Sequence, residues 1–371
     1  MNTNTPRQSP AEQDESAKQL LSRTARDLPA GRHQFHKERL MAQIHQTQQE
    51  ERTAAAEAVA PARTRRLRLP RPAIMLPALA AALAGTVVTG VVLNDSGGVR
   101  DAGVATGPAL TTHIGAATTK GVPQLLDQIS LAAAESKGTH PAVKPGQYVY
   151  IESKTADSFV KTVDDKSSLA SHTLHRRQVW MSSDGTKGWL IDPAVNDSSE
   201  GETLSLPDEQ GNTPVGSLNH PTYDYLAELT TDPDTILAKI YKETKGQGNT
   251  PDQQAFETIG DLLVESYPPA ELYPALFKAA AKIPGVVVVN DAVDAVGRPG
   301  IAVARLDETS GEREEWIFDK KTHVFLGDRS VKVTASTGED ALIKPGTVTF
   351  TNAIVTRAVV DGMKQTPSAT G

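Results

Sequence analysis

Residues 74–93 read IMLPALAAALAGTVVTGVVL, and this stretch decides how the rest of the chain is laid out. It holds twenty residues without a charge, which as a helix rising about 1.5 Å per residue would span about 30 Å. Pro77 falls in the first turn, where its missing N–H breaks no helical hydrogen bond. We therefore predict a transmembrane helix over residues 73–94. A buried core helix is the alternative, although few run this long uncharged beside basic residues.

Five arginines stand just before the predicted span: Arg63, Arg65, Arg66, Arg68 and Arg71. No acidic residue lies between Val59 and Asn94 to balance them. Basic residues flanking a span remain on the cytoplasmic side of the membrane. The sequence thus predicts a single-pass protein of the cell membrane, with residues 1–72 in the cytoplasm and the C-terminal part extracytoplasmic.

The 371 residues divide their charge unevenly. Residues 1–73 hold 13 Lys/Arg and 8 Asp/Glu, which leaves 25 basic and 37 acidic residues beyond them. An acidic exterior part argues against nucleic acid as a partner. The chain has no cysteine, which excludes disulfides, thiolate nucleophiles and cysteine-bound zinc together.

The cytoplasmic segment, residues 1–72, is polar and has a partly helical pattern with one narrow apolar stripe, formed by Leu40, Met41 and Ile44. A stripe of this width is a marginal helix alone but can dock on a partner helix or groove. A solvated tether leading to the membrane is an equally good interpretation, and both stay open.

Beyond the span, residues 95–120 are rich in Gly, Thr, Ala and Ser and predict a flexible spacer. Residues 121–363 predict one extracytoplasmic domain, and residues 364–371 a disordered tail. Helical periodicity occurs over Val122–Glu135, Pro221–Leu229, Pro233–Glu243, the stretch opened by Pro251, and Ala270–Ile283. Alternating or apolar strand patterns occur over Gln147–Lys154, Arg177–Met181, Gly188–Asp192, Val286–Asn290, Gly300–Leu306, Glu314–Phe318, His323–Leu326, Ser330–Thr334 and Thr347–Asp361.

A central block of helices between two sets of hairpins is typical of an α+β fold. We predict an antiparallel sheet, open or curled into a half-barrel, with the helices packed on one face. Five aromatic residues fall on its strands: Tyr148, Tyr150, Trp180, Trp189 and Trp316. Core packing is one interpretation of these side chains. The other is that they border an apolar cleft between sheet and helices.

The motifs of common nucleotide-binding, hydrolase and zinc-protease sites are absent from the sequence. We therefore assign no catalytic residue, cofactor or metal, and predict that the protein is not an enzyme. His172 and His175 lead into a strand, so a shared metal is disfavoured. The acidic pair Glu314–Glu315 has the pattern of an ordinary surface turn entering a strand.

Several segments are similar to one known family: GQYVYIES, VWMSSDG, PTYDYLAELTTDPDTILAKIYKET, PDQQAFETIGDLL, IPGVVVVNDAVDAVGRPGIAVAR and EEWIFDKKTHVFLGD. Together with the basic N-terminal segment and Arg-flanked span, they resemble an actinobacterial family of single-pass membrane proteins of unknown function. That resemblance implies association with extracytoplasmic-function sigma factors. The order of strands, helix block and strands also resembles the lipoprotein-carrier fold, in which helices close a half-open sheet over an apolar cavity. Neither resemblance assigns a role to any residue.

These observations favour a non-enzymatic envelope sensor or regulator, with an extracytoplasmic ligand-binding domain and a cytoplasmic contact to a sigma factor. The alternative is a membrane-tethered carrier or chaperone for a lipid or glycolipid. A hydrolase of the envelope is a third hypothesis, for which the sequence offers no motif.

Overall fold

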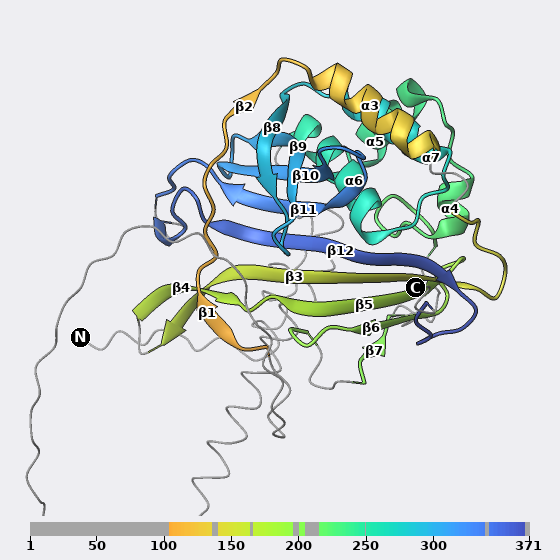
Figure 1. Ribbon diagram of the computed structural model, residues 1–371, viewed down its shortest axis with the longest axis horizontal. Helices are drawn as coiled ribbons and strands as arrows, with labels where there is room; N and C mark the ends of the chain where they lie inside the picture. The colour runs from red at the N-terminus through yellow and green to blue at the C-terminus, as the bar shows by residue number, and fades with distance from the viewer. Residues whose placement is uncertain are drawn as a thin grey trace, which may run out of the picture. The chain divides into compact units, whose positions relative to one another are not determined.

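The computed structural model describes residues 104–135, 140–163, 166–195, 200–204, 215–248, 250–337 and 341–367 (Figure 1). The predicted cytoplasmic segment, its stripe, the arginine cluster and the span at 73–94 all lie outside the described residues. Among the residues that are described, no helix is both long and apolar enough to cross a membrane.

Antiparallel hairpins build one 12-stranded sheet, which confirms the predicted α+β class (Figure 1). Its strands are β1 Thr106–Pro108, β2 Ala117–Thr118, β3 Tyr148–Val163, β4 Lys166–His172, β5 His175–Ser182, β6 Gly188–Ile191, β7 Glu202–Thr203, β8 Val286–Val293, β9 Pro299–Asp307, β10 Glu312–Asp319, β11 Phe325–Lys332 and β12 Val348–Val360. They follow the order β2-β8-β9-β10-β11-β12-β3-β5-β6-β7, with β4 beside β3 and β1 beside β4. The long central pair, β12 and β3, joins the C-terminal strands to the N-terminal ones.

Five helices lie between or before these strands: α3 Val122–Glu135, α4 Tyr223–Ala227, α5 Pro233–Glu243, α6 Pro251–Glu265 and α7 Leu272–Ala280. Each of α4, α5 and α6 begins at a side-chain cap, because Thr222, Asp232 and Thr250 accept a hydrogen bond from a backbone N–H three residues on. Proline occupies the first turn of α5 and α6, where it needs no donor. The predicted starts of both helices are therefore confirmed.

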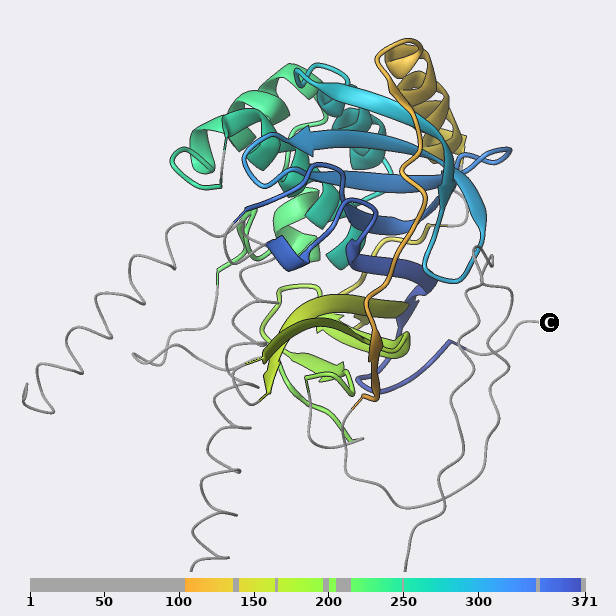
Figure 2. The ribbon, with the colours of Figure 1, turned by 90° about the vertical axis from the view of Figure 1, so that its left-hand side faces the viewer.

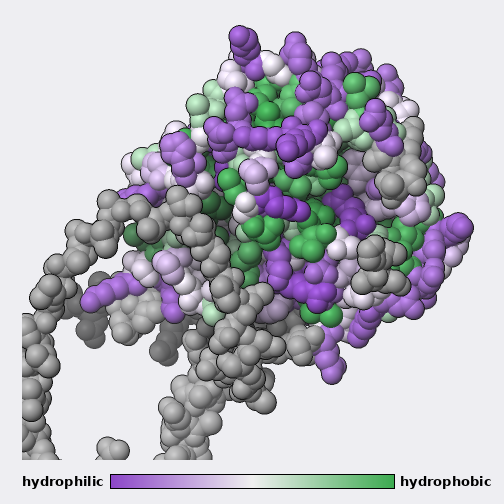
Figure 3. All heavy atoms as spheres, in the orientation of Figure 1, coloured by the Kyte–Doolittle hydropathy of each residue, from purple (hydrophilic) through white to green (hydrophobic). Residues whose placement is uncertain are grey.

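The main core lies between the helices and strands β8–β11 (Figure 1). Phe256 of α6 stacks on Trp316 of β10, with ring centroids 3.9 Å apart and ring planes 6° from parallel. Gly260, one turn further along α6, faces the same indole. On the face shown in Figure 3, hydrophobic residues gather near the middle of the domain and hydrophilic residues surround them. In the interior, the stacking of Phe256 on Trp316 anchors α6 on the sheet.

The structure corrects the predicted spacer at 95–120 over its described part. Residues 104–118, which we name the strap, run across the sheet from β1 to β2 (Figure 2). The strap pairs with β4 at one end and β8 at the other, and Thr111 forms a bridge with Thr347 between them. Of the two glycines in the strap, Gly115 packs closely on β8, since an added Cβ would lie 2.7 Å from Val289, whereas Gly107 faces open space.

Two further predictions differ from the structure. Part of the tail predicted to be disordered is packed, because Lys364 lies 3.5 Å above the ring of Trp189 and the Gln365 carbonyl accepts a hydrogen bond from Trp180 at 2.6 Å. The stretches His323–Leu326 and Ser330–Thr334 form one strand, β11, instead of two. Gly327 in its centre has φ 149°, a backbone conformation that brings β11 close to the β12 carbonyl of Asn352.

Candidate functional site

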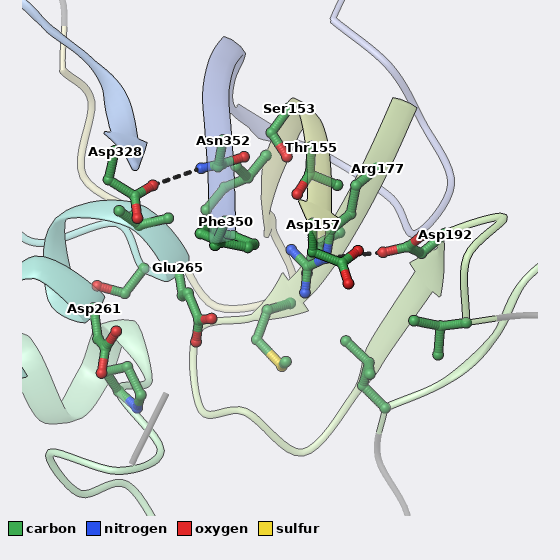
Figure 4. Close-up of a pocket in the computed structure, with 18 of the residues that line it drawn as sticks. Ser153, Thr155, Asp157, Arg177, Asp192, Asp261, Glu265, Asp328, Phe350 and Asn352 are labelled. Atoms are coloured by element: carbon green, nitrogen blue, oxygen red, sulfur yellow. Dashed lines mark hydrogen bonds and ion pairs between the residues drawn. The ribbon is translucent and has the colours of Figure 1, made fainter. Parts of the chain in front are cut away.

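A cavity of about 410 Å³ lies between the sheet and the C-terminal end of α6 (Figure 4). Its floor comes from β3 and β5, and side chains of β10–β12, the loop after β6 and the loop before α4 complete the wall. Along β3 the residues Val149, Ile151, Ser153, Thr155 and Asp157 face the cavity. Their spacing of two follows from the pleat of a strand, which directs alternate side chains to the same face.

The register between β3 and β5 makes the floor change character along its length. At one end Val149 lies opposite Met181, and Ile151 lies opposite Val179. At the other end Ser153 lies opposite Arg177, and Thr155 opposite His175. The cavity therefore has an apolar end and a polar end, which suits an amphipathic occupant.

Acidic residues dominate the charged lining: Asp157, Asp192, Asp261, Glu265, Glu312, Glu314 and Asp328. Among the described lining residues, Arg177 is the single permanent cation, accompanied by His175 and His220. Within hydrogen-bond reach, Asp328 accepts from the Asn352 side chain at 3.3 Å, and Glu312 accepts from Thr349 at 2.9 Å. The polar end is thus strongly negative.

A histidine–carboxylate network closes the polar end. His175 Nε2 lies 3.0 Å from Asp192 Oδ1, and Arg177 Nε lies 3.5 Å from Asp192 Oδ2. Burial, the largest single influence, lowers the pKa of His175, but the hydrogen bond and charge of Asp192, the Thr173 carbonyl and the charge of Asp157 together outweigh it, and the pKa is raised. Burial likewise opposes ionisation of Asp192, yet His175 and Arg177 hold the pKa of Asp192 below its usual value. Each member of this pair thus favours the charged form of the other.

Two acidic side chains reach the cavity from α6, opposite the strands. Figure 4 shows Asp261 and Glu265 on the helix side and Asp157, Arg177 and Asp192 on the strand side. The Glu265 side chain, at the end of α6, is accessible to solvent, but this solvent fills the cavity and protein atoms lie around it. Burial raises the pKa of the Glu265 carboxyl, and the charge of Arg177 only partly opposes this.

Four of the five aromatic residues predicted to border an apolar cleft, all but Trp316, share one cluster, but none of the five lines the cavity. Trp316 is buried in the main core beneath α6. The other four side chains lie on the opposite face of the sheet from the cavity, where Tyr150 and Trp180 pack with Val360. On β3 the sequence pattern was correct in period, but the cavity face is the one with Val149 and Ile151. The core-packing interpretation describes Tyr150, Trp180 and Trp316.

The two histidines of the sequence His172-Thr-Leu-His175 end on different strands, β4 and β5. Their rings lie 6.4 Å apart and edge-on, and each meets a different carboxylate: His172 Nδ1 is 2.7 Å from Asp157 Oδ1. Within the residues that the structure describes, no group of three metal-ligating side chains is found.

The pair Glu314–Glu315, expected at the surface, is buried. Glu314 faces the cavity, while Glu315 faces the other side of β10 and lies between Arg313 and Arg329. Arg313, two residues before Glu315 and on the same face of β10, was the sequence signal that this carboxylate could be buried in an ion pair.

No family model matches the chain, and no curated protein matches it. Among solved structures, one that is similar is the complex of MucA and MucB from Pseudomonas aeruginosa. The aligned residues are 11% identical and cover 67% of this chain and 59% of that chain, with a TM-score of 0.22. The likeness thus spans less than two thirds of the length of that chain.

Proposed function

We propose that this chain is a non-enzymatic, membrane-anchored regulator whose extracytoplasmic domain binds a ligand in the cavity beneath α6. The observation that carries the proposal is the cavity itself. Its volume of about 410 Å³ falls in the range of roughly 300–1,000 Å³ that small-molecule sites occupy. Apolar and charged walls are combined within it, as in sites that fix the orientation of a ligand.

A pair of matched variants tests the cavity. Ser153 faces the cavity from β3, and Lys154, the next residue, points to the other face of the sheet. Phenylalanine at Ser153 should fill the floor of the cavity, whereas phenylalanine at Lys154 should leave it unchanged.

The measurement is native mass spectrometry of the full-length protein, purified from membranes in non-ionic detergent and exposed to a small-molecule extract of the same cells. We expect the wild type and K154F to retain a bound mass that S153F loses. Retention of the same mass by S153F would refute binding at this site.

The regulatory half of the proposal concerns residues 1–72. Their apolar stripe, Leu40, Met41 and Ile44, is wide enough to contact a partner helix, and the family resemblance implies that the partner is a sigma factor. Crosslinking from native membranes should recover a sigma factor with the full-length protein and lose it in the L40E/I44E variant. Recovery that is unaffected by these two charges would eliminate the stripe as the contact.

The apolar end of the cavity favours a second candidate, a tethered carrier for a lipid or glycolipid. Val149, Ile151, Val179 and Met181 form a continuous apolar floor there, on which an acyl chain would lose its contact with water. A carrier must release its cargo to acceptor vesicles, whereas a sensor need not. Transfer of the bound mass to vesicles therefore separates the two candidates.

A further inference from the structure

The polar end of the cavity contains two carboxyl groups that lack a full set of hydrogen-bond and ion-pair partners. Asp157 is 5% exposed, and its Oδ1 is engaged by His172 at 2.7 Å. Its Oδ2 is buried and has no hydrogen-bond partner among the described residues. Buried carboxylate oxygens are otherwise nearly always paired, so this atom indicates a missing donor.

Glu265 faces Asp157 across the same cavity (Figure 4). Within the part of the chain that the structure describes, it forms no hydrogen bond and no ion pair, and Arg177 is the one cation whose charge acts on it. Arg177 is itself engaged with Asp192 at 3.5 Å. Neither Asp157 Oδ2 nor Glu265 therefore has a cation of its own.

The surroundings strengthen the electrostatic preference of this end. Seven acidic residues line the cavity against a single arginine and two histidines. Because protein walls screen charges less than water does, an incoming cation is attracted by those of these carboxyl groups that are ionised, and its binding favours ionisation of Glu265, whose pKa burial raises. An incoming anion would be repelled by the same set. A neutral group could satisfy one oxygen but would leave the excess charge in place.

We infer that the cavity binds an organic ammonium ligand, with its charged nitrogen between Asp157 and Glu265 and its apolar body on the floor formed by β3 and β5. The apolar floor, Val149, Ile151, Val179 and Met181, begins next to the polar end. One molecule with a charged end and an apolar body therefore meets both parts of the cavity. This inference rests on the proposed function, because it names the class of ligand for the same site.

Three probes of equal length and different charge test the inference: 4-phenylbutylammonium, 4-phenylbutanol and 4-phenylbutanoate. Each is titrated calorimetrically at neutral pH into the full-length protein in non-ionic detergent. We expect the ammonium probe to bind at least about tenfold more tightly than the alcohol, which is the effect of one charge-assisted contact. The carboxylate should bind most weakly.

Variants locate the charged end. In E265Q and D157N the ammonium probe should lose about tenfold in affinity while the alcohol binds as before. The control is E228Q, since Glu228 is an exposed residue at the end of α4 and does not line the cavity. Loss of alcohol binding in the same variants would show that the cavity had changed shape, so the pair of probes separates misfolding from lost charge.

The outcomes distinguish this inference from the proposed function. If the alcohol or the carboxylate binds as tightly as the ammonium probe, the cavity binds ligands but its preference for a cation is refuted. If no probe binds while the wild type still retains its own ligand and S153F does not, the inference alone fails. If neither probes nor a native ligand bind, both fail.

An ammonium group with an apolar body occurs both in soluble amines and in aminolipids. Repeating the titration in nanodiscs of phosphatidylglycerol, with and without phosphatidylethanolamine, separates these sources. A weaker apparent affinity for the probe when phosphatidylethanolamine is present indicates an aminolipid, and an unchanged affinity indicates a soluble amine. Either result is compatible with the cationic site. If the ammonium probe binds no more tightly than the alcohol in both kinds of nanodisc, the cationic site is refuted.

Discussion

Replacing Glu315 by glutamine should remove the charge that holds two buried arginines together. The Glu315 side chain is fully buried on the face of β10 that carries Ile317, opposite the face on which Trp316 meets the helices. Its Oε1 accepts from Arg313 Nε at 2.8 Å, and its Oε2 accepts from Arg329 Nε at 2.8 Å. Both guanidinium groups are almost as inaccessible as Glu315, and each also bonds to the strap: Arg313 to the Gly115 carbonyl and Arg329 to the Thr112 hydroxyl.

The magnitude follows from what the substitution leaves behind. Glutamine is similar in size but carries no charge, so two buried cations would remain without a counterion. Removing one partner of a buried ion pair destabilises a protein by about 3–5 kcal/mol. The Coulomb energy of one unit-charge pair at about 4 Å and an effective dielectric constant of about 20 is also about 4 kcal/mol. Both routes predict that E315Q loses a large part of a typical free energy of unfolding.

Urea unfolding of the full-length protein in non-ionic detergent, followed by the fluorescence of the neighbouring Trp316, measures this loss. The control is E243Q, since Glu243 pairs with Lys239 at 2.5 Å on the exposed side of α5. Such i,i+4 surface pairs contribute only about 0.3–0.5 kcal/mol. A loss below about 1 kcal/mol for E315Q would refute the assignment of Glu315 as the counterion of both arginines.

Two other substitutions test the helix packing and the histidine–carboxylate network. A Cβ added at Gly260 would lie 2.5 Å from Trp316 Nε1, so G260A should destabilise the protein by about 1–2 kcal/mol despite better helix propensity, whereas G107A, in open space, should not. Asp192 raises the pKa of His175 above 6.5, so its stabilisation is complete below that pH and lost as pH rises through the folded-state pKa. The difference in free energy of unfolding between wild type and H175Q should therefore shrink from about pH 6 to pH 8, and a constant difference would contradict the network.

Helices were the most predictable part of this fold because their signals are local. Asp232 followed by Pro233 specifies a cap and a first turn without reference to the rest of the chain, and Val122–Glu135 has the same bounds in sequence and structure. The strap was not predictable, since its Gly- and Thr-rich sequence is equally typical of a spacer. Long-range contacts decide between them, such as that of Thr112 with Arg329, 217 positions away.

The cavity was missed for a different physical reason. Alternation identifies two faces of a strand but does not say which face meets the helices. On β3 the large rings of Tyr148 and Tyr150 favour either core packing or a ligand cleft, and the structure packs them on the face away from the cavity. The face with Ser153, Thr155 and Asp157 is the one that α6 covers. The alternating polar residues Ser153, Thr155 and Asp157 were the better signal, because polar side chains on a covered face of a sheet are either paired or line a cavity.

The strap connects the cavity to the part of the chain that precedes the domain, and this gives a test that separates sensor from carrier. Ser158 lines the cavity, and its hydroxyl accepts a hydrogen bond from the Leu110 N–H of the strap at 3.3 Å. On β10, Glu314 faces the cavity while its neighbour Glu315 holds the arginines that bind the strap. A ligand that moves Ser158 or Glu314 therefore alters the hydrogen bonds that hold the strap on the sheet.

A sensor needs this coupling, since a ligand alters a distant segment only through contacts that differ between the free and bound states. Hydrogen exchange of the full-length protein, with and without a saturating ligand, measures it at the amides of Leu110 and Thr112, which bond to Ser158 and to the Gly346 carbonyl. We expect their exchange to slow at least severalfold on binding while that of the exposed end of α5 stays constant. Unchanged exchange in the strap of a protein that does bind ligand would favour the carrier, because a carrier needs a cavity but no route from it to the membrane.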